Sequence, residues 1–227
     1  MKTMMRCLVV SFLMIMVILL STPQAHAQDL SKYRNFSFGM TVADLSKQID
    51  QQPANAAVLH ERPALIQELT WWPPQPYGTL RPAEPVEQIL FSFYNGALYR
   101  MLVTYDNSAT KGLTDEDMIR VVSTKYGAAT KPVAVVNFPM NPSYKANEKV
   151  IARWEDSQYS LNLFRSYGDT FAIVMFTRQM DAQAGNSIAA SVKLEQEEAP
   201  QKQAARVKKD ADDLDLERQK NIKTLRP

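Results

Sequence analysis

The stretch from residue 149 to 178 constrains the fold most, because it holds three consecutive apolar runs separated by turn signals. Strand residues alternate between the two faces of a sheet, so a two-residue turn at Asp156 and Ser157 fixes which side chains face each other. That turn predicts these cross-strand pairs: Trp154 with Tyr159, Ala152 with Leu161, and Val150 with Leu163. These six side chains would share an apolar face.

The other face of this predicted hairpin is polar, with Arg153, Glu155, Gln158, Ser160 and Asn162. One apolar and one polar face are typical of a half-buried antiparallel sheet. A third apolar run, from Phe171 to Phe176, follows the Tyr167–Asp169 turn signal and extends the sheet. The stretch therefore predicts an antiparallel sheet that forms the core of the protein.

The N-terminus has the order of a secretory signal peptide. Lys2 and Arg6 precede an apolar run from residue 8 to 20, and Ala25 and Ala27 form a small-x-small cleavage site. The apolar run is shorter than the roughly 20 residues that cross a bilayer. We expect cleavage after Ala27, which leaves no stable membrane anchor and places the protein in the periplasm or outside the cell. The alternative is a retained N-terminal anchor.

Processing at Ala27 would change the charge balance and the thiol content of the chain. The sequence has 26 basic and 24 acidic residues, and the loss of Lys2 and Arg6 makes these numbers equal. A neutral protein lacks the basic excess that favours nucleic acid. The only cysteine, Cys7, would also be removed. The processed chain would then have no disulfide, thiolate metal site or cysteine nucleophile.

Two helix starts with the same chemistry lie far apart in the chain. In each, a threonine N-cap (Thr41 or Thr114) stands three residues before an aspartate (Asp44 or Asp117), with apolar residues on both sides. The first predicts a helix from about residue 42 to 50. The second predicts a helix that Gly127 ends. Two such starts, each followed by strands, suggest an internal repeat.

Each predicted helix is followed by a strand, a proline-containing loop and a hairpin. The strands are 65–72 and 133–138, and the hairpins are 86–106, with an Asn-Gly turn, and 150–164. We therefore predict an α+β protein with two helix-plus-antiparallel-sheet (αβββ-like) units. The predicted domains are a signal peptide (1–27), an α+β domain (28–180) with units at about 36–106 and 113–178, and a charged helical tail (181–227).

The segment Phe38-Gly39-Met40-Thr41, which opens a helix that a strand and a hairpin follow, resembles the repeated units of the β-lactamase-inhibitor-protein type. More loosely, it resembles small outer-membrane assembly lipoproteins, and the chain as a whole looks like secreted bacterial proteins with a charged C-terminal helix. The resemblance covers about residues 36–178. It implies a binding or scaffolding role and transfers no site residues. The inhibitors carry disulfides and the assembly proteins a lipidated cysteine, which the processed chain lacks.

The tail from residue 181 to 227 has nine basic and nine acidic side chains and no aromatic residue. Val207, Ala211 and Leu214 keep a thin four-then-three spacing, and Pro200 is expected to interrupt the helix. Three charge pairs stand at i,i+4 spacing: Arg206–Asp210, Lys208–Asp212 and Lys209–Asp213. The two interpretations are a solvated, partly frayed helix and a coiled coil that needs a partner.

The sequence shows no catalytic motif and implies no cofactor or metal. His60 would be the only histidine after processing, so a histidine-based triad or a multi-histidine metal site lacks its residues. We expect His60 to lie at the surface or at a helix end. Acids could support glycoside hydrolysis, but Glu155 and Asp156 lie at a predicted turn and Asp115–Asp117 in a first helical turn. Both places favour acids for structural reasons.

Adjacent aromatic residues provide the candidate binding site. Trp71 and Trp72 must point to opposite faces of a strand, so one can enter the core while the other faces solvent. Together with Tyr77 and Tyr144, which lie in the two proline-containing loops, they are the candidate partner-binding residues. The alternative is that the loop folds over the second tryptophan.

These patterns favour an exported, non-enzymatic module that binds or scaffolds a protein partner in the bacterial envelope. Two alternatives stay open. One is a carboxylate-based hydrolase of cell-wall or polymeric sugar, which needs two acids that converge in a cleft. The other is a domain that binds a small molecule or a lipid, which needs an apolar pocket between helices and sheet.

Overall fold

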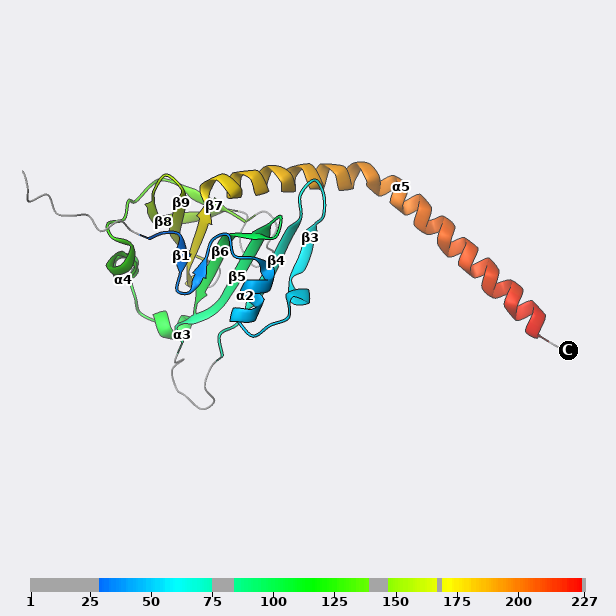
Figure 1. Cartoon of the computed structure of the whole chain (residues 1–227), viewed down its shortest axis with the longest axis horizontal. Helices are drawn as coiled ribbons and strands as arrows, with labels where there is room; N and C mark the ends of the chain where they lie inside the picture. Colours follow the sequence, from blue (N-terminus) through cyan, green and yellow to red (C-terminus); the bar gives the residue numbers. More distant parts are fainter. Residues whose placement is uncertain (1–28, 75–83, 139–146, 167–168, 226–227) are drawn as a thin grey trace, which may run out of the picture.

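An eight-stranded antiparallel sheet forms the centre of the protein in a computed structural model, which describes residues 29–74, 84–138, 147–166 and 169–225. The strand order is β3-β4-β5-β6-β10-β9-β8-β7 (Figure 1). The strands are β3 (Ala57–His60), β4 (Ile66–Trp71), β5 (Val86–Tyr94), β6 (Ala97–Tyr105), β7 (Val135–Asn137), β8 (Asn147–Glu155), β9 (Tyr159–Arg165) and β10 (Phe171–Thr177).

The helices and a small second sheet complete the architecture. They are β1 (Lys32–Tyr33), β2 (Phe36–Ser37), α2 (Val42–Gln48), the 3-10 turn η1 (Pro53–Asn55), α3 (Asn107–Thr110), α4 (Asp115–Tyr126) and α5 (Arg178–Thr224). The predicted α+β class with a charged C-terminal helix is confirmed. The signal-peptide prediction falls on residues 1–27, outside the described residues.

Each of the helices α2 and α4 is followed by four strands that run from an edge of the sheet to its centre. The two innermost strands, β6 and β10, pair with each other, with Met101 opposite Met175. The sequence predicts the strand 171–176 and the two hairpins, but β3 was missed. The run 171–176 also lies at the centre of the sheet, between β6 and β9. The internal repeat stays a prediction.

Both predicted helix starts are confirmed. The Thr41 hydroxyl accepts a hydrogen bond from the Asp44 N–H at 3.1 Å, and Thr114 and Asp117 form a reciprocal capping box. Gly127 ends α4 with a φ of 74°. Such side chains satisfy N–H groups that the first turn of a helix leaves unpaired. They position α2 and α4 over the same face of the sheet.

The main core lies between that face and the helices. It contains Leu45 of α2, Met118 and Val122 of α4, and buried strand residues such as Phe91 and Trp154. Trp154 is 1% exposed, and its indole N–H donates to the Gly127 carbonyl at 2.8 Å. A smaller cluster on the opposite face includes Leu90, Leu102, Phe138, Phe164 and Val174. The sheet is thus apolar on both faces at its centre.

The predicted register of the β8–β9 hairpin is wrong by two residues. Trp154 pairs with Leu161 and Ala152 with Leu163. The turn is wider than two residues because the Asp156 carboxylate accepts the N–H groups of Gln158 and Tyr159, each at 2.7 Å. A shift of two residues leaves each side chain on its predicted face of the sheet, since side chains alternate between the faces with a period of two.

Two details of the facing differ from the prediction. Val150 joins the cluster on the opposite face, because a β-bulge lies between it and Ala152. The predicted polar face is not solvated throughout: Asn162 is 0% exposed. It accepts a hydrogen bond from Arg153 at 2.6 Å and donates one to the Ser160 hydroxyl at 3.0 Å. These partners allow a polar side chain to be buried.

Helix α5 runs through Pro200, so the predicted interruption there is wrong. Proline removes one backbone hydrogen bond and crowds the preceding turn, which kinks a helix. Figure 1 shows α5 changing direction in its orange stretch, the part of the sequence around residue 200. The surrounding residues are mostly strong helix formers and exposed, so water can reach the carbonyl that loses its partner.

Candidate interaction surface

Helix α5 begins directly after β10 and is positioned by the turn between β8 and β9. The Arg178 N–H donates to the Gln158 carbonyl at 2.8 Å, and the Arg178 guanidinium donates to the Asp156 carbonyl at 3.0 Å. The turn thus satisfies an N–H group that a first helical turn leaves unpaired. This fixes the direction in which α5 leaves the sheet.

The first part of α5, residues 178–198, packs on the rest of the protein, and we call it the anchor. Ala184 is 1% exposed and lies in a cluster with Ile66 of β4 and Tyr99 of β6. Ser191 is equally buried, and its hydroxyl donates to the backbone carbonyl of Arg62, in the connection between β3 and β4. The anchor therefore joins the centre of the sheet to its β3 edge, as Figure 1 shows.

A group of charged side chains lies where the anchor starts. Arg100 of β6 donates to the Asp181 carboxylate at 3.1 Å, and its guanidinium lies over the rings of Phe138 and Phe176. Burial raises the pKa of Asp181, and Arg100 acts in the opposite direction. Burial likewise raises the pKa of Glu68, which accepts a hydrogen bond from Ser92 at 3.2 Å.

The far end of the anchor carries two side-chain contacts, one with β3 and one with the β3–β4 connection. The His60 Nδ1 lies 2.9 Å from the Glu195 carboxylate, and the Arg62 guanidinium donates to both oxygens of Glu198 at 3.0 and 2.9 Å. His60 is 4% exposed, so the predicted surface or helix-end position is wrong. The residue lies on strand β3, which the sequence did not predict, and α5 covers it.

Beyond the anchor, every described residue from 199 to 225 is exposed. We call this part of α5 the arm, and it extends away from the sheet in Figure 1. At about 1.5 Å per residue the arm is roughly 40 Å long. Its large apolar side chains are exposed by 62 to 78%: Val207, Leu214, Leu216, Ile222 and Leu225. None of them has a neighbour from another described element.

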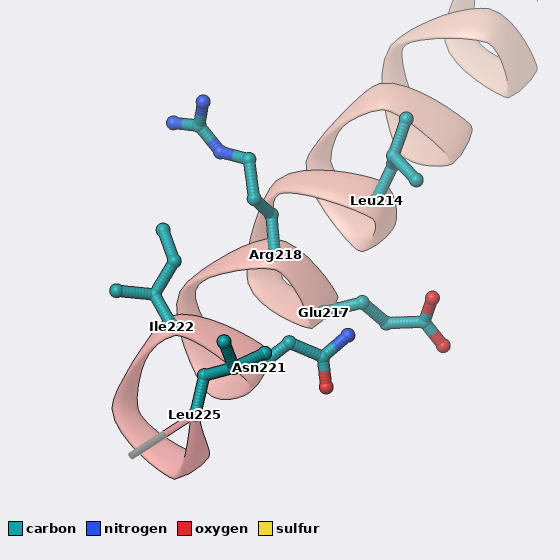
Figure 2. Close-up of a pocket in the computed structure, with 6 residues that line it drawn as sticks. All are labelled: Leu214, Glu217, Arg218, Asn221, Ile222 and Leu225. Carbon is teal, nitrogen blue, oxygen red and sulfur yellow. The ribbon is translucent and has the colours of Figure 1, made fainter. Parts of the chain in front are cut away.

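A shallow groove, open to solvent and formed by this helix alone, runs along the end of the arm, and Figure 2 shows its lining. It is lined by Leu214, Glu217, Arg218, Asn221, Ile222 and Leu225. The lining combines apolar side chains with charged ones of both signs, and Arg218 lies between Leu214 and Ile222. A second helix can pack on such a surface, because its apolar side chains can meet Leu214, Ile222 and Leu225 while its polar side chains meet Glu217 and Arg218.

Comparison with known proteins finds no matching family model, no matching curated protein and no matching solved structure. The resemblance to the β-lactamase-inhibitor-protein type therefore rests on residues 38–41 and the order of the elements alone.

The two tryptophans of the predicted binding site lie in different environments. Trp71 is half-buried and packs edge-to-face on Phe36, with the ring centroids 5.6 Å apart. Trp72, directly after the end of β4, is 61% exposed. The structure thus brings Trp71 into the core and leaves Trp72 at the surface. Tyr77 and Tyr144 lie outside the described residues, and a binding role for these four residues stays a prediction.

The acids considered for catalysis have structural roles. Asp117 caps α4, and Asp115 binds the Arg165 guanidinium at 2.8 Å. Asp156 holds the β8–β9 turn through the N–H groups of Gln158 and Tyr159. Each carboxylate stabilises a helix end, a turn or an ion pair.

Within the described parts of the chain, no group of three or more histidine, cysteine or acidic side chains could hold a metal ion. Among the same residues, no helix combines the length and the apolar character needed to cross a bilayer.

Sequence reasoning missed the buried group around Arg100, because its members come from β4, β5, β6 and α5. A signal was present for Asp181, an acid at the start of a helix that follows an apolar strand. The sequence indicated the arm more clearly than it indicated this buried group. The four-then-three spacing of Val207, Ala211 and Leu214 marks the same part of α5 that the structure leaves exposed.

Proposed function

We propose that this protein is an exported, non-enzymatic interaction module of the bacterial envelope, which presents the arm of α5 to a protein partner. The proposal rests on one observation. Residues 199 to 224 form a continuous helix without burying a single residue, while the anchor before them is fixed to the sheet. In proteins most helix stability comes from packing an amphipathic face against another element. A partner would supply that packing.

The anchor supports this role because it holds the arm in a defined direction. Arg100 binds Asp181 at the start of the anchor. The backbone carbonyl of Arg62 accepts a hydrogen bond from Ser191 in its middle, and the Arg62 guanidinium binds Glu198 at its end. A fixed helix loses less freedom on binding than a flexible tail, which reduces the entropic cost of association. Trp72 offers a second contact surface, to which we propose that Tyr77 and Tyr144 also contribute. Residues 1–27 support export, with cleavage after Ala27.

Site-specific photocrosslinking in intact cells tests the proposal. The crosslinking side chain replaces Ile222 on the arm in one variant and Val121 on α4 in the other, since these residues are similarly exposed at 66% and 59%. We expect a discrete crosslinked protein species in the envelope fraction for position 222 and none for position 121. Equal background at both positions would show that the arm has no protein partner.

A further inference from the structure

We infer that the end of the anchor, residues 191–198, is a latch that holds the edge strand β3 on the sheet and opens separately from the start of α5. We call residues 178–184, at the start of the anchor, the root. The root stays docked when the latch opens. This inference goes beyond the proposed function and does not depend on it, since it concerns contacts within one chain.

The root is held by apolar packing. Met180 and Ala184 lie in a cluster with Ile66 of β4 and Tyr99 of β6, and Ala184 is 1% exposed. The stabilisation that such packing gives grows with the apolar area that is removed from water. Departure of the root would expose this whole cluster, so the root is the firmly held part of the anchor.

The latch is held by polar contacts instead. Ser191 is its only buried residue, and its hydroxyl donates to the Arg62 carbonyl. Further along, the Glu195 carboxylate lies 2.9 Å from the His60 Nδ1, and Glu198 accepts two hydrogen bonds from the Arg62 guanidinium. The exposed fractions of these two acidic side chains are 57% and 30%. Because water competes for such groups, each contact adds little net stability.

Closure of the latch has a cost at His60. The imidazole is 4% exposed, and its Nε2 is buried without a hydrogen-bond partner among the described residues. A buried polar atom without a partner has lost its bond to water and gained none in return. Water reaches this nitrogen when the latch opens, which stabilises the open state. The closed state is thus favoured by a small margin.

A weak point in α5 separates the root from the latch. Gly185, Asn186 and Ser187 are poor helix formers, and glycine and serine are common where helices bend. A bend there moves the latch away from β3 and leaves Ala184 in place. Ile188, which also packs on the cluster of the root, directly follows the bend and is displaced little.

Strand β3 depends on the latch for its place in the sheet. It lies at an edge, and its only neighbour in the sheet is β4. The pairing involves Ala57, Val58 and His60, with a β-bulge between the last two. Ala57 and Val58 are exposed, so they add little apolar burial. A short edge strand with few contacts opens readily. Release of His60 by the latch therefore frees β3.

The latch thereby controls the outer edge of β4. Strand β3 covers Ile66 to Glu68 of β4, and β4 ends directly before the exposed Trp72. When β3 leaves, the backbone of this edge loses its partner. The latch also continues into the arm within one helix, so the same bend changes the direction of the arm (Figure 1). The direction of the arm and the pairing of β4 thus change together.

Hydrogen exchange of β3 tests the latch. Glu195→Ala and Glu198→Ala each remove one of its carboxylate contacts. Glu197→Ala is the control, since the Glu197 side chain is about as exposed as that of Glu195, 61% against 57%, and pairs with Lys193 of the same helix. We expect the first two variants to accelerate amide exchange of residues 57–60 at least roughly fivefold, and the control to leave it unchanged. Exchange in β10, at the centre of the sheet, should be the same in all three.

Thiol labelling at position 184 tests whether the root stays docked. The full chain with Cys7→Ser has no cysteine, so Ala184→Cys introduces a single thiol at a buried site. We expect Glu198→Ala to leave the labelling rate of this thiol within about twofold while exchange in β3 accelerates.

Three results would overturn the inference. Equal exchange of β3 in the three alanine variants would show that Glu195 and Glu198 do not hold this strand. Acceleration throughout the sheet would show that the whole protein unfolds. A labelling rate at position 184 that rises in parallel with the exchange of β3 would show that the whole anchor leaves the sheet as one unit.

Discussion

Asp181, in the first turn of α5, accepts a hydrogen bond at 3.1 Å from Arg100 of β6, one of the two strands at the centre of the sheet. The pair is partly buried, with side-chain exposures of 25% and 16%. Since β10 ends immediately before α5, this contact bends the chain back over β6 as soon as the helix starts. The longest helix of the protein is thus attached to the most internal strand pair.

Ala184 carries the apolar part of the same attachment. We expect Ala184→Glu to lower the free energy of unfolding by about 2–4 kcal/mol, because it places a charge among Ile66 and Tyr99. Hydrogen exchange should also accelerate in β3 and β4, which the anchor contacts. Ala189→Glu, an exposed position on the same helix, should change neither quantity. Equal exchange in the two variants would show that α5 is not held at this position.

The second prediction concerns which side chains of the β8–β9 hairpin point into the core. Trp154→Ala should cost about 3–5 kcal/mol of stability, since it removes a large buried side chain from the main core. Glu155→Ala, on the opposite face, should cost less than about 0.5 kcal/mol. Urea unfolding of both variants checks this. Similar midpoints would contradict the observed facing.

The face that each side chain of the β8–β9 hairpin occupies could be predicted. It depends only on the alternation of apolar and polar residues, which Trp154, Leu161 and Leu163 show without tertiary information. The register could not, because it depends on the bonds that Asp156 makes across its turn. The same holds for Val150, whose face depends on a bulge that leaves no local pattern. Strand β3 was missed for a third reason: it is a short edge strand, and His60 is buried by a helix that lies far away in the sequence.

Glu84 gives the fold a pH dependence. It accepts hydrogen bonds from the Arg34 guanidinium at 2.9 and 2.6 Å, and Arg34 lowers the pKa of the Glu84 carboxyl from its ordinary value of 4.5. A carboxyl whose pKa falls on folding stabilises the protein above the unfolded pKa and loses that contribution as the pH falls. Glu84→Gln should therefore cost about 1–2 kcal/mol at pH 7.

The cost of Glu84→Gln should shrink as the pH falls below 4.5, because the unaltered Glu84 then becomes protonated as well. Urea unfolding at several pH values measures the difference between the two proteins. Glu87→Gln, on the exposed side of β5, is the control and should show no such trend. A constant cost at all pH values would mean that the Arg34 contact does not depend on the charge of Glu84.

Substitutions of the two adjacent tryptophans should have different effects, one on stability and the other on partner binding. Trp71→Ala should destabilise the protein by about 2–4 kcal/mol, because the ring packs on Phe36 in the core. Trp72→Ala should cost the fold less than about 1 kcal/mol, since the ring is largely exposed, and should weaken partner binding by 2 kcal/mol or more, roughly 30-fold. Thermal unfolding and a binding titration measure the two effects. Normal binding by a folded Trp72→Ala variant would remove this residue from the proposed surface.

The candidate surface was only partly predictable for a related reason. Opposite orientations of Trp71 and Trp72 follow from strand geometry, and the spacing of Val207, Ala211 and Leu214 follows from helix geometry. The attachment of α5 does not, because Arg100, Asp181 and Ala184 come together only when the last helix folds back onto the sheet. Pro200 taken alone also predicts a break in the helix. The helix-forming residues around it instead continue the helix, which changes direction there.

The pairing of β6 with β10 has a consequence for the order in which the chain folds. Met101 and Met175 are opposite each other, so this contact closes a long loop and carries a large entropic cost. Until residues 171–177 are available, β6 presents an unpaired edge with apolar side chains on both of its faces, a template for aggregation. We therefore expect the two halves of the sheet to join late, after the last strand has been synthesised. If the chain is exported, as we propose, its sheet would be completed only once the chain up to residue 177 has crossed the membrane.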